Sequence, residues 1–203
     1  MEHGDGLEKA LARLGIQASP EQISRLLSYE RTLADLGVRA GVVAPGDRER
    51  LRERHLLDSA RAVPVLPRSG LCCDLGSGGG LPGVVVAILA PELQVCLVER
   101  RGRKAGFLEH VVRELGLANA WVEPGPLEGL EPGKADAATA RALAPLDRSW
   151  RHARRILRPG GHLVYFSGSG GREVPPSLTD AEILEVPAPD EVSGSLVIIT
   201  RKT

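Results

Sequence analysis

A glycine-rich segment at residues 74–83 constrains the fold of this chain more than any other feature. It reads Asp74-Leu75-Gly76-Ser77-Gly78-Gly79-Gly80-Leu81-Pro82-Gly83 and directly follows the apolar run Leu71-Cys72-Cys73. Glycines let the backbone turn sharply and lie against a ligand that a Cβ would push away. Amides at the start of a helix favour a polar or anionic group. The segment therefore predicts a strand, a ligand-binding loop and a helix in succession.

From residue 67 onward, short apolar runs alternate with helical patterns. This alternation is typical of a parallel sheet covered by helices. The predicted strands are residues 71–73, 94–98, 120–122, 135–140, 162–166, 183–186 and 195–200. The predicted helices are residues 82–90, 103–115 and 146–157, the last stopped by Pro159-Gly160-Gly161. The expected fold class is α/β, with a mostly parallel seven-stranded sheet and helices on both faces.

The first 66 residues contain no strand candidate. Apolar residues follow helical spacing over 7–14 and 20–36, and Ser19 with Gln22 forms a capping box at the start of the second helix. A further helix is predicted over 47–62, capped by Asp47. We therefore expect a helical segment, residues 1–66, that packs on a second unit, residues 67–203.

Composition narrows the function classes. Aromatic residues make up only 3% of the chain, which argues against a base-stacking platform. Basic and acidic residues balance at 26 each, but nucleic-acid binding depends on where the charges lie. No apolar run reaches the roughly 18 residues of a membrane span, and the polar N-terminus is no signal peptide. Three cysteines without a C-x-x-C pair offer neither a disulfide framework nor a metal site, so we expect a cytoplasmic protein without metal or membrane partner.

The glycine loop fits the sequence patterns of two classes of ligand-binding loop to different degrees. The dinucleotide pattern G-x-G-x-x-G fails from Gly76, because the sixth position is Leu81. It fits from Gly78, but the preceding loop is then too long. The alternative D-x-G-x-G-x-G, starting at Asp74, resembles motif I of the class I S-adenosylmethionine-dependent methyltransferases.

In the methyltransferase frame, Asp74 would lie near the amino-acid part of the cofactor. Glu99 ends the next predicted strand, where its two oxygens can accept hydrogen bonds from both ribose hydroxyls. The alternative interpretation of Glu99 is a solvated residue beside Arg100 and Arg101.

Three further segments join the glycine loop in a more specific resemblance. They are L-V-E-R-R-G-R-K-A-G-F-L at 97–108, A-T-A-R-A-L-A-P-L at 138–146 and R-H-L-L-D-S at 54–59. Together the four segments resemble the RsmG (GidB) family, the 16S rRNA (guanine(527)-N7)-methyltransferases, over roughly residues 20–166. The resemblance implies a Rossmann-like class I methyltransferase fold, S-adenosylmethionine as cofactor, and 16S rRNA or the 30S subunit as partner. We also expect a monomer.

By position, the resemblance places Gly76, Leu81, Leu127, Glu128 and Arg141 in the cofactor site, and Glu99 where the family usually has Asp. With motif I, the predicted cofactor residues are Asp74, Gly76, Gly78, Gly80, Leu81, Glu99, Leu127, Glu128 and Arg141. The chain departs from the family pattern at Tyr29-Glu30, which lacks the usual Asn, and at Ser167-Gly168, where many members have Lys-Gly. These departures leave the cofactor motifs intact and concern the expected handling of the substrate.

Methyl transfer to guanine N7 uses a lone pair and needs no general base, so we assign no catalytic residue. Arg141 and His55 are positioning candidates; the alternatives are an Arg that bridges loops to a nearby carboxylate and a His that anchors its helix. Cys72, Cys73 and Cys96 fall inside predicted strands, which disfavours the cysteine chemistry of pyrimidine C5 methylation. The RNA-binding candidates are Arg100, Arg101, Arg103 and Lys104.

Three other functions stay open at this point. The chain could methylate another RNA base or a small molecule, or it could be a non-catalytic RNA- or ribosome-binding protein that keeps the fold. A dinucleotide-dependent oxidoreductase is the third.

Overall fold

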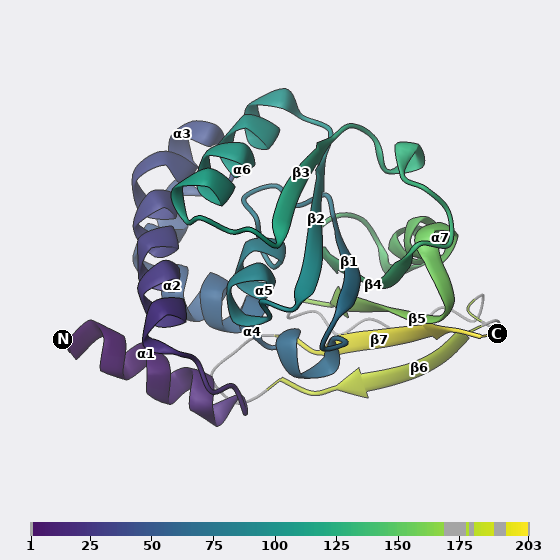
Figure 1. Cartoon of the computed structure of the whole chain (residues 1–203), viewed down its shortest axis with the longest axis horizontal. Helices are drawn as coiled ribbons and strands as arrows, with labels where there is room; N and C mark the ends of the chain where they lie inside the picture. The colour runs from purple at the N-terminus through teal and green to yellow at the C-terminus, as the bar shows by residue number, and fades with distance from the viewer. Residues whose placement is uncertain (1, 169–177, 179–180, 189–193, 203) are drawn as a thin grey trace.

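The computed structural model describes residues 2–168, 178, 181–188 and 194–202 (Figure 1). Its centre is a seven-stranded sheet in the order β3-β2-β1-β4-β5-β7-β6. The strands are β1 Gly70–Leu75, β2 Leu93–Glu99, β3 Ala120–Pro124, β4 Ala135–Arg141, β5 Leu157–Phe166, β6 Ala181–Val186 and β7 Leu196–Arg201. The first five run parallel, and β7 pairs antiparallel with both β5 and β6. The mostly parallel seven-stranded sheet predicted from the sequence is confirmed.

Helices cover both faces of the sheet. One face packs against α5 (Gly83–Leu89) and α6 (Gly102–Glu114), and the other against α7 (Leu146–Ile156), as Figure 1 shows. Strand side chains alternate between these two cores, so Cys72 faces the first and Cys73 the second. All three cysteines are buried thiols, as predicted.

Over the described residues 2–66, the chain before the sheet forms helices joined by short turns and contains no strand. Its segments are α1 Glu2–Arg13, α2 Pro20–Thr32, α3 Val38–Ala40 and α4 Asp58–Ala60, with π-helical turns at Leu33–Gly37 and Arg52–Leu57 and 3₁₀ turns at Pro45–Arg50 and Val63–Val65. The predicted capping box is present: Ser19 Oγ accepts from the Gln22 amide, and Gln22 Oε1 accepts from the Ser19 amide. Apolar side chains of these helices share one core with α5 and α6, so this segment packs directly on the sheet domain.

The prediction that Asp47 caps a single helix over 47–62 is wrong. The segment begins with a 3₁₀ turn at Pro45, and no side chain caps it. The Asp47 carboxylate instead accepts from Arg54 Nη1 at 2.7 Å and lies 3.5 Å from His55 Nε2. A charged partner seven residues further along the chain therefore binds the carboxylate in place of the backbone amides.

The start of β5 also differs from the expectation. The helix ends at Ile156, and the chain passes directly into β5 at Leu157, five residues before the predicted start. Pro159-Gly160-Gly161 lies within the strand, where the register with β4 shifts between Ala135 and Ala137. Within the described ranges, no helix has the length and apolar character to cross a membrane.

Candidate functional site

The sheet order places the carboxyl ends of β1 and β4 side by side at the point where the strand order reverses. Ligands of open α/β sheets bind in the crevice at such a point. The glycine loop leaves β1 here, and Arg141 ends β4. Two cavities open at this edge.

The glycine loop is held in a conformation that only glycine adopts readily. Gly76, Gly78 and Gly80 have φ values of +70°, +56° and +91°. The amide of Ser77, between the first two, donates to Val98 O at 2.9 Å, and its hydroxyl donates to Asp74 O. The first bond fixes the loop to the neighbouring strand β2, and the second fixes it to the end of β1.

Asp74 is buried inside the protein and lines neither cavity. Its side chain is 1% exposed; Oδ1 accepts from Thr139 Oγ1 at 2.7 Å and Oδ2 from the Gly83 amide at 3.2 Å. Burial raises the pKa of this carboxyl above its ordinary value, against the hydrogen bonds from Thr139, Ser77 and Gly83. Asp74 thus ties β1 to β4 and to the start of α5.

The motif glycines face different surroundings. A Cβ on Gly80 would lie 2.5 Å from Val84 Cγ2 and 2.9 Å from the Tyr29 hydroxyl, so this glycine permits packing inside the protein. A Cβ on Gly78 would meet nothing closer than Gly76 O at 3.8 Å. Only Gly78 of this pair therefore faces open space that a ligand can use.

Glu99 holds the loop through both carboxylate oxygens. Oε2 accepts from the Gly78 amide at 3.0 Å and Oε1 from the Arg101 amide at 2.8 Å. The residue is only 7% exposed, so the alternative of a solvated residue is wrong. Each oxygen keeps a second lone pair, and Glu99 lines the cavity beside Gly78.

We call this space the glycine-loop cavity; its volume is about 380 Å³. It brings together five residues of the predicted cofactor set: Gly76, Gly78, Glu99, Leu127 and Glu128. Three other predicted residues, Asp74, Gly80 and Leu81, border neither cavity.

The predicted RNA-binding residues fall into two groups, those that line the glycine-loop cavity and one that does not. Arg100, Arg101 and Lys104 line the glycine-loop cavity, whereas Arg103 is exposed outside it. Arg148 and His152 of α7 line the opposite wall, although the sequence analysis did not place them there. Their i, i+4 spacing on one helix face was the available signal.

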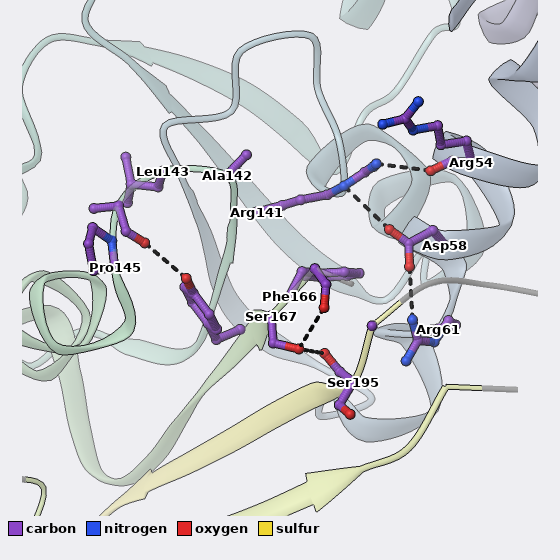
Figure 2. A pocket seen from close by; sticks show the side chains of 14 residues that line it. Arg54, Asp58, Arg61, Arg141, Ala142, Leu143, Pro145, Phe166, Ser167 and Ser195 are labelled. Carbon is purple, nitrogen blue, oxygen red and sulfur yellow. Dashed lines mark hydrogen bonds and ion pairs between the residues drawn. The ribbon is translucent and has the colours of Figure 1, made fainter. Parts of the chain in front are cut away.

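The second space, the arginine cavity, has a volume of about 490 Å³ and is shown in Figure 2. Arg141 lies along its wall and is fixed by the R-H-L-L-D-S segment. Its guanidinium donates to Ser59 Oγ at 3.2 Å, to Arg54 O at 2.9 Å and to His55 Nδ1 at 2.9 Å, and its Nε lies 3.4 Å from Asp58 Oδ2. The structure thus shows the alternative considered for Arg141, a bridge to a nearby carboxylate, and Arg141 does not border the glycine-loop cavity.

His55 is a neutral acceptor in this arrangement. Arginine can only donate, so Nδ1 must carry the lone pair that receives the Arg141 proton. Burial, and next the charge of Arg141, lower the pKa of His55 below its ordinary value. His55 therefore helps to hold Arg141 in place.

Residues 142–144 form a wall common to both cavities. Ala142 has a φ of +52°, a left-handed conformation that is strained for a residue other than glycine. The Tyr165 hydroxyl donates to Ala144 O at 3.0 Å and fixes the end of this wall. The two cavities therefore adjoin one another at residues 142–144.

The residues that depart from the family pattern have structural partners. Tyr29 is buried and its hydroxyl donates to Gly79 O at 2.5 Å, which joins α2 to the glycine loop. Glu30 forms an ion pair with Arg52 at 2.6 Å. Ser167 lines the arginine cavity and donates to Ser195 O at 2.9 Å.

Comparisons with known proteins agree with this geometry. The family model described as rRNA small subunit methyltransferase G matches residues 22–175. A protein named "Ribosomal RNA small subunit methyltransferase G" from Stenotrophomonas maltophilia (strain K279a) is 40% identical over 183 residues, which cover 90% of this chain and 81% of the relative. Proteins of the same name from Acidothermus cellulolyticus and Thermobifida fusca are 38% and 43% identical over 71% and 69% of this chain. The matched regions span 64% and 60% of those two relatives, so the chain corresponds to about three-fifths of their length.

Solved structures support the fold. A methyltransferase from Geobacter sulfurreducens aligns with a TM-score of 0.57 at 16% identity, covering 77% of this chain and 84% of its own. A SAM-dependent methyltransferase from Aquifex aeolicus aligns with a TM-score of 0.58 at 14% identity, covering 77% and 94%. The fold is thus the Rossmann-like fold of class I methyltransferases, as predicted. By its matched segments and its relatives, the chain belongs to the rRNA small subunit methyltransferase G family.

Proposed function

We propose that this chain transfers a methyl group from S-adenosylmethionine to N7 of a guanine, position 527, in the 16S rRNA of the small ribosomal subunit. One observation carries the proposal: the glycine-loop cavity, with Glu99 and the open side of Gly78, shares the wall 142–144 with a second cavity. A methyl donor and its acceptor need two adjoining sites of this kind.

The chain's own residues fit the cofactor in the glycine-loop cavity. Glu99 offers its free lone pairs to the ribose hydroxyls, and the missing side chain of Gly78 leaves room for the ligand. Leu127 and Glu128 line the cavity after β3, where the adenine would lie. When bound, S-adenosylmethionine supplies an electrophilic methyl group on a sulfonium sulfur.

The acceptor base would enter the arginine cavity against the wall 142–144. Guanine N7 attacks through a lone pair and loses no proton beforehand, so alignment and exclusion of water are the main requirements. Arg141 and His55 act as positioning residues, because their hydrogen bond fixes the end of β4 from which this wall begins. The three predicted residues that border neither cavity have a structural role, because they pack or form hydrogen bonds inside the protein next to the glycine loop. They are Asp74, Gly80 and Leu81.

The surface around the glycine-loop cavity favours an RNA partner. Arg100, Arg101 and Arg103 are exposed, and Lys104 is half-buried beside them at the start of α6. These cations can contact phosphates, so binding of 16S rRNA or of the 30S subunit should weaken as salt rises. We further propose that the protein acts as a cytoplasmic monomer.

The test is methylation by the full chain with methyl-labelled S-adenosylmethionine and either naked 16S rRNA or 30S subunits. We expect label in 7-methylguanosine after digestion to nucleosides. Label in another base, or in a small molecule only, would contradict the proposed acceptor. Calorimetry with S-adenosylmethionine and its demethylated product separates the remaining alternative, because a non-catalytic RNA-binding protein without a cofactor site would bind neither.

A further inference from the structure

One end of the arginine cavity carries an excess of positive charge. Among the residues that the structure describes, three guanidinium groups line it, those of Arg54, Arg61 and Arg141, against the single carboxylate of Asp58. Figure 2 shows these four side chains on one side of the cavity, with Leu143 and Pro145 on the other. The asymmetry indicates that this end can receive an anion.

Arg61 provides the most specific signal. Its side chain is 5% exposed, and Nη1 donates to Asp58 Oδ1 at 2.9 Å. Its Nη2 is buried and has no hydrogen-bond partner within the part of the chain that the structure describes. A buried charged donor without an acceptor is costly and rare in folded proteins, so Nη2 is a site where a ligand oxygen would be stabilising.

Asp58 does not supply the missing acceptor. Its Oδ1 is committed to Arg61, and its Oδ2 faces Arg141 at 3.4 Å. One carboxylate is thus shared between two guanidinium groups, while Arg54 pairs outward with Asp47. The end of the cavity keeps cationic donors in excess.

We propose that this end is a phosphate subsite, which takes the phosphate of the nucleotide whose base lies against the wall 142–144. The inference rests on the proposed function and deepens it. Base and phosphate of one nucleotide lie on opposite sides of its ribose, and Figure 2 shows Leu143 and the arginine side chains on opposite sides of the cavity. Guanidinium groups bind phosphate oxygens in a bidentate manner that suits a nucleotide.

The position of the arginines favours a substrate phosphate over the cofactor carboxylate. Arg54, Asp58, Arg61 and Arg141 line the arginine cavity but not the glycine-loop cavity, and the two spaces share only residues 142–144. Because Nη2 lies below the surface, phosphate binding requires the Arg61 guanidinium to rotate toward the cavity.

The experiment is calorimetry on the full chain saturated with S-adenosylhomocysteine, titrated with guanosine 5′-monophosphate, guanosine and inorganic phosphate. We expect the monophosphate to bind at least about tenfold more tightly than guanosine, because charge-assisted hydrogen bonds form only with the phosphate. Inorganic phosphate alone should bind weakly. Arg61→Lys should remove most of the advantage of the monophosphate, because lysine lacks the planar fork that would let Nη1 stay on Asp58 while Nη2 binds the phosphate.

Two further variants keep the result interpretable. Arg54 is 53% exposed at the mouth of the cavity, so Arg54→Gln tests the same subsite without disturbing the core and should lower monophosphate affinity several-fold. Arg39→Lys, at an exposed position of α3 outside both cavities, is the matched control and should bind as wild type does. If Arg61→Lys does not fold, Arg54→Gln still decides the question.

The outcomes separate this proposal from the proposed function. Equal binding of guanosine and its monophosphate, or unchanged monophosphate affinity in Arg54→Gln and Arg61→Lys, would overturn the phosphate subsite. So would a loss in Arg61→Lys of affinity for S-adenosylmethionine but not for the carboxylate-free 5′-methylthioadenosine, because the anion would then be the cofactor carboxylate. In each of these cases, wild-type binding of S-adenosylmethionine would leave the methyltransferase assignment intact.

Discussion

The two glycines Gly78 and Gly80 belong to one sequence motif, yet the structure predicts opposite consequences for their substitution. A side chain at Gly78 would enter the glycine-loop cavity, whereas a side chain at Gly80 would enter the packed core beside Tyr29 and Val84. We therefore expect Gly78→Val to remove cofactor binding and leave the fold, and Gly80→Ala to weaken the fold.

The magnitudes follow from the backbone and the neighbours. Both residues have positive φ, which costs an L-residue about 1–2 kcal/mol. That strain is the main expected cost for Gly78→Val, because a Cβ at this position would lie 3.8 Å from its nearest neighbour, Gly76 O, which is an ordinary van der Waals contact. Gly80→Ala adds an overlap at 2.5 Å with Val84, and overpacking of a core costs a further ~1–3 kcal/mol. In a chain of this size each kcal/mol lowers Tm by roughly 2–4 °C.

Thermal melting and calorimetry with S-adenosylmethionine on the two variants check this reasoning. Gly78→Val should show no measurable binding and the smaller loss of Tm; Gly80→Ala should show the larger loss of Tm and keep binding at temperatures where it is folded. Wild-type cofactor affinity in Gly78→Val, or a reversed order of Tm, would refute the assignment of the two glycines.

Three further changes test other parts of the site. Glu99→Gln replaces one carboxylate oxygen, which accepts from a backbone amide, with an NH₂ group that can only donate. Because a hydrogen bond to a charged group contributes ~1.5–3 kcal/mol, affinity for S-adenosylmethionine should fall about tenfold or more. An unchanged Kd would contradict the role of Glu99. His55→Asn keeps an acceptor near the position of Nδ1 for Arg141, whereas His55→Gln does not, so rRNA methylation should survive better in the Asn variant, and the opposite order would argue against positioning through Nδ1. Burial lowers the pKa of His162, so the unfolded chain takes up this proton first as pH falls below the ordinary value of 6.5, and stability is lost there. His162→Gln, which keeps a donor for Val65 O, should gain in Tm relative to wild type below pH 6.5; a gap independent of pH would show that His162 does not contribute.

The sheet could be predicted from the sequence because its strands are short apolar runs bounded by glycine, proline or charged residues. β1, β2 and β4 each match this pattern, and burial of both faces leaves little ambiguity. The capping box at Ser19 is a local signal and was equally readable. Asp47 satisfied the same local rule, but its tertiary partners Arg54 and His55 decided its role.

The candidate site could be predicted only in part from the sequence, because the direction in which a loop residue faces depends on contacts with residues distant in the chain. Glu99, Gly76 and Gly78 reached the glycine-loop cavity as predicted. Gly80 did not, because Tyr29, some fifty residues earlier in the chain, occupies the space beside it.

Arg61 was missed altogether. It follows Asp58 by three residues, a spacing that indicates an ion pair but gives no hint of a cavity. The cavity that Arg61 lines is completed by residues distant in the sequence, among them Ser167 and Ser195.

The most direct test of the central claim is a crystal structure of the full chain with S-adenosylhomocysteine. We expect the nucleoside in the glycine-loop cavity, with its ribose hydroxyls donating to the Glu99 carboxylate and its amino-acid part passing Gly78. A nucleoside bound elsewhere, with Glu99 still engaged only by the amides of Gly78 and Arg101, would contradict it.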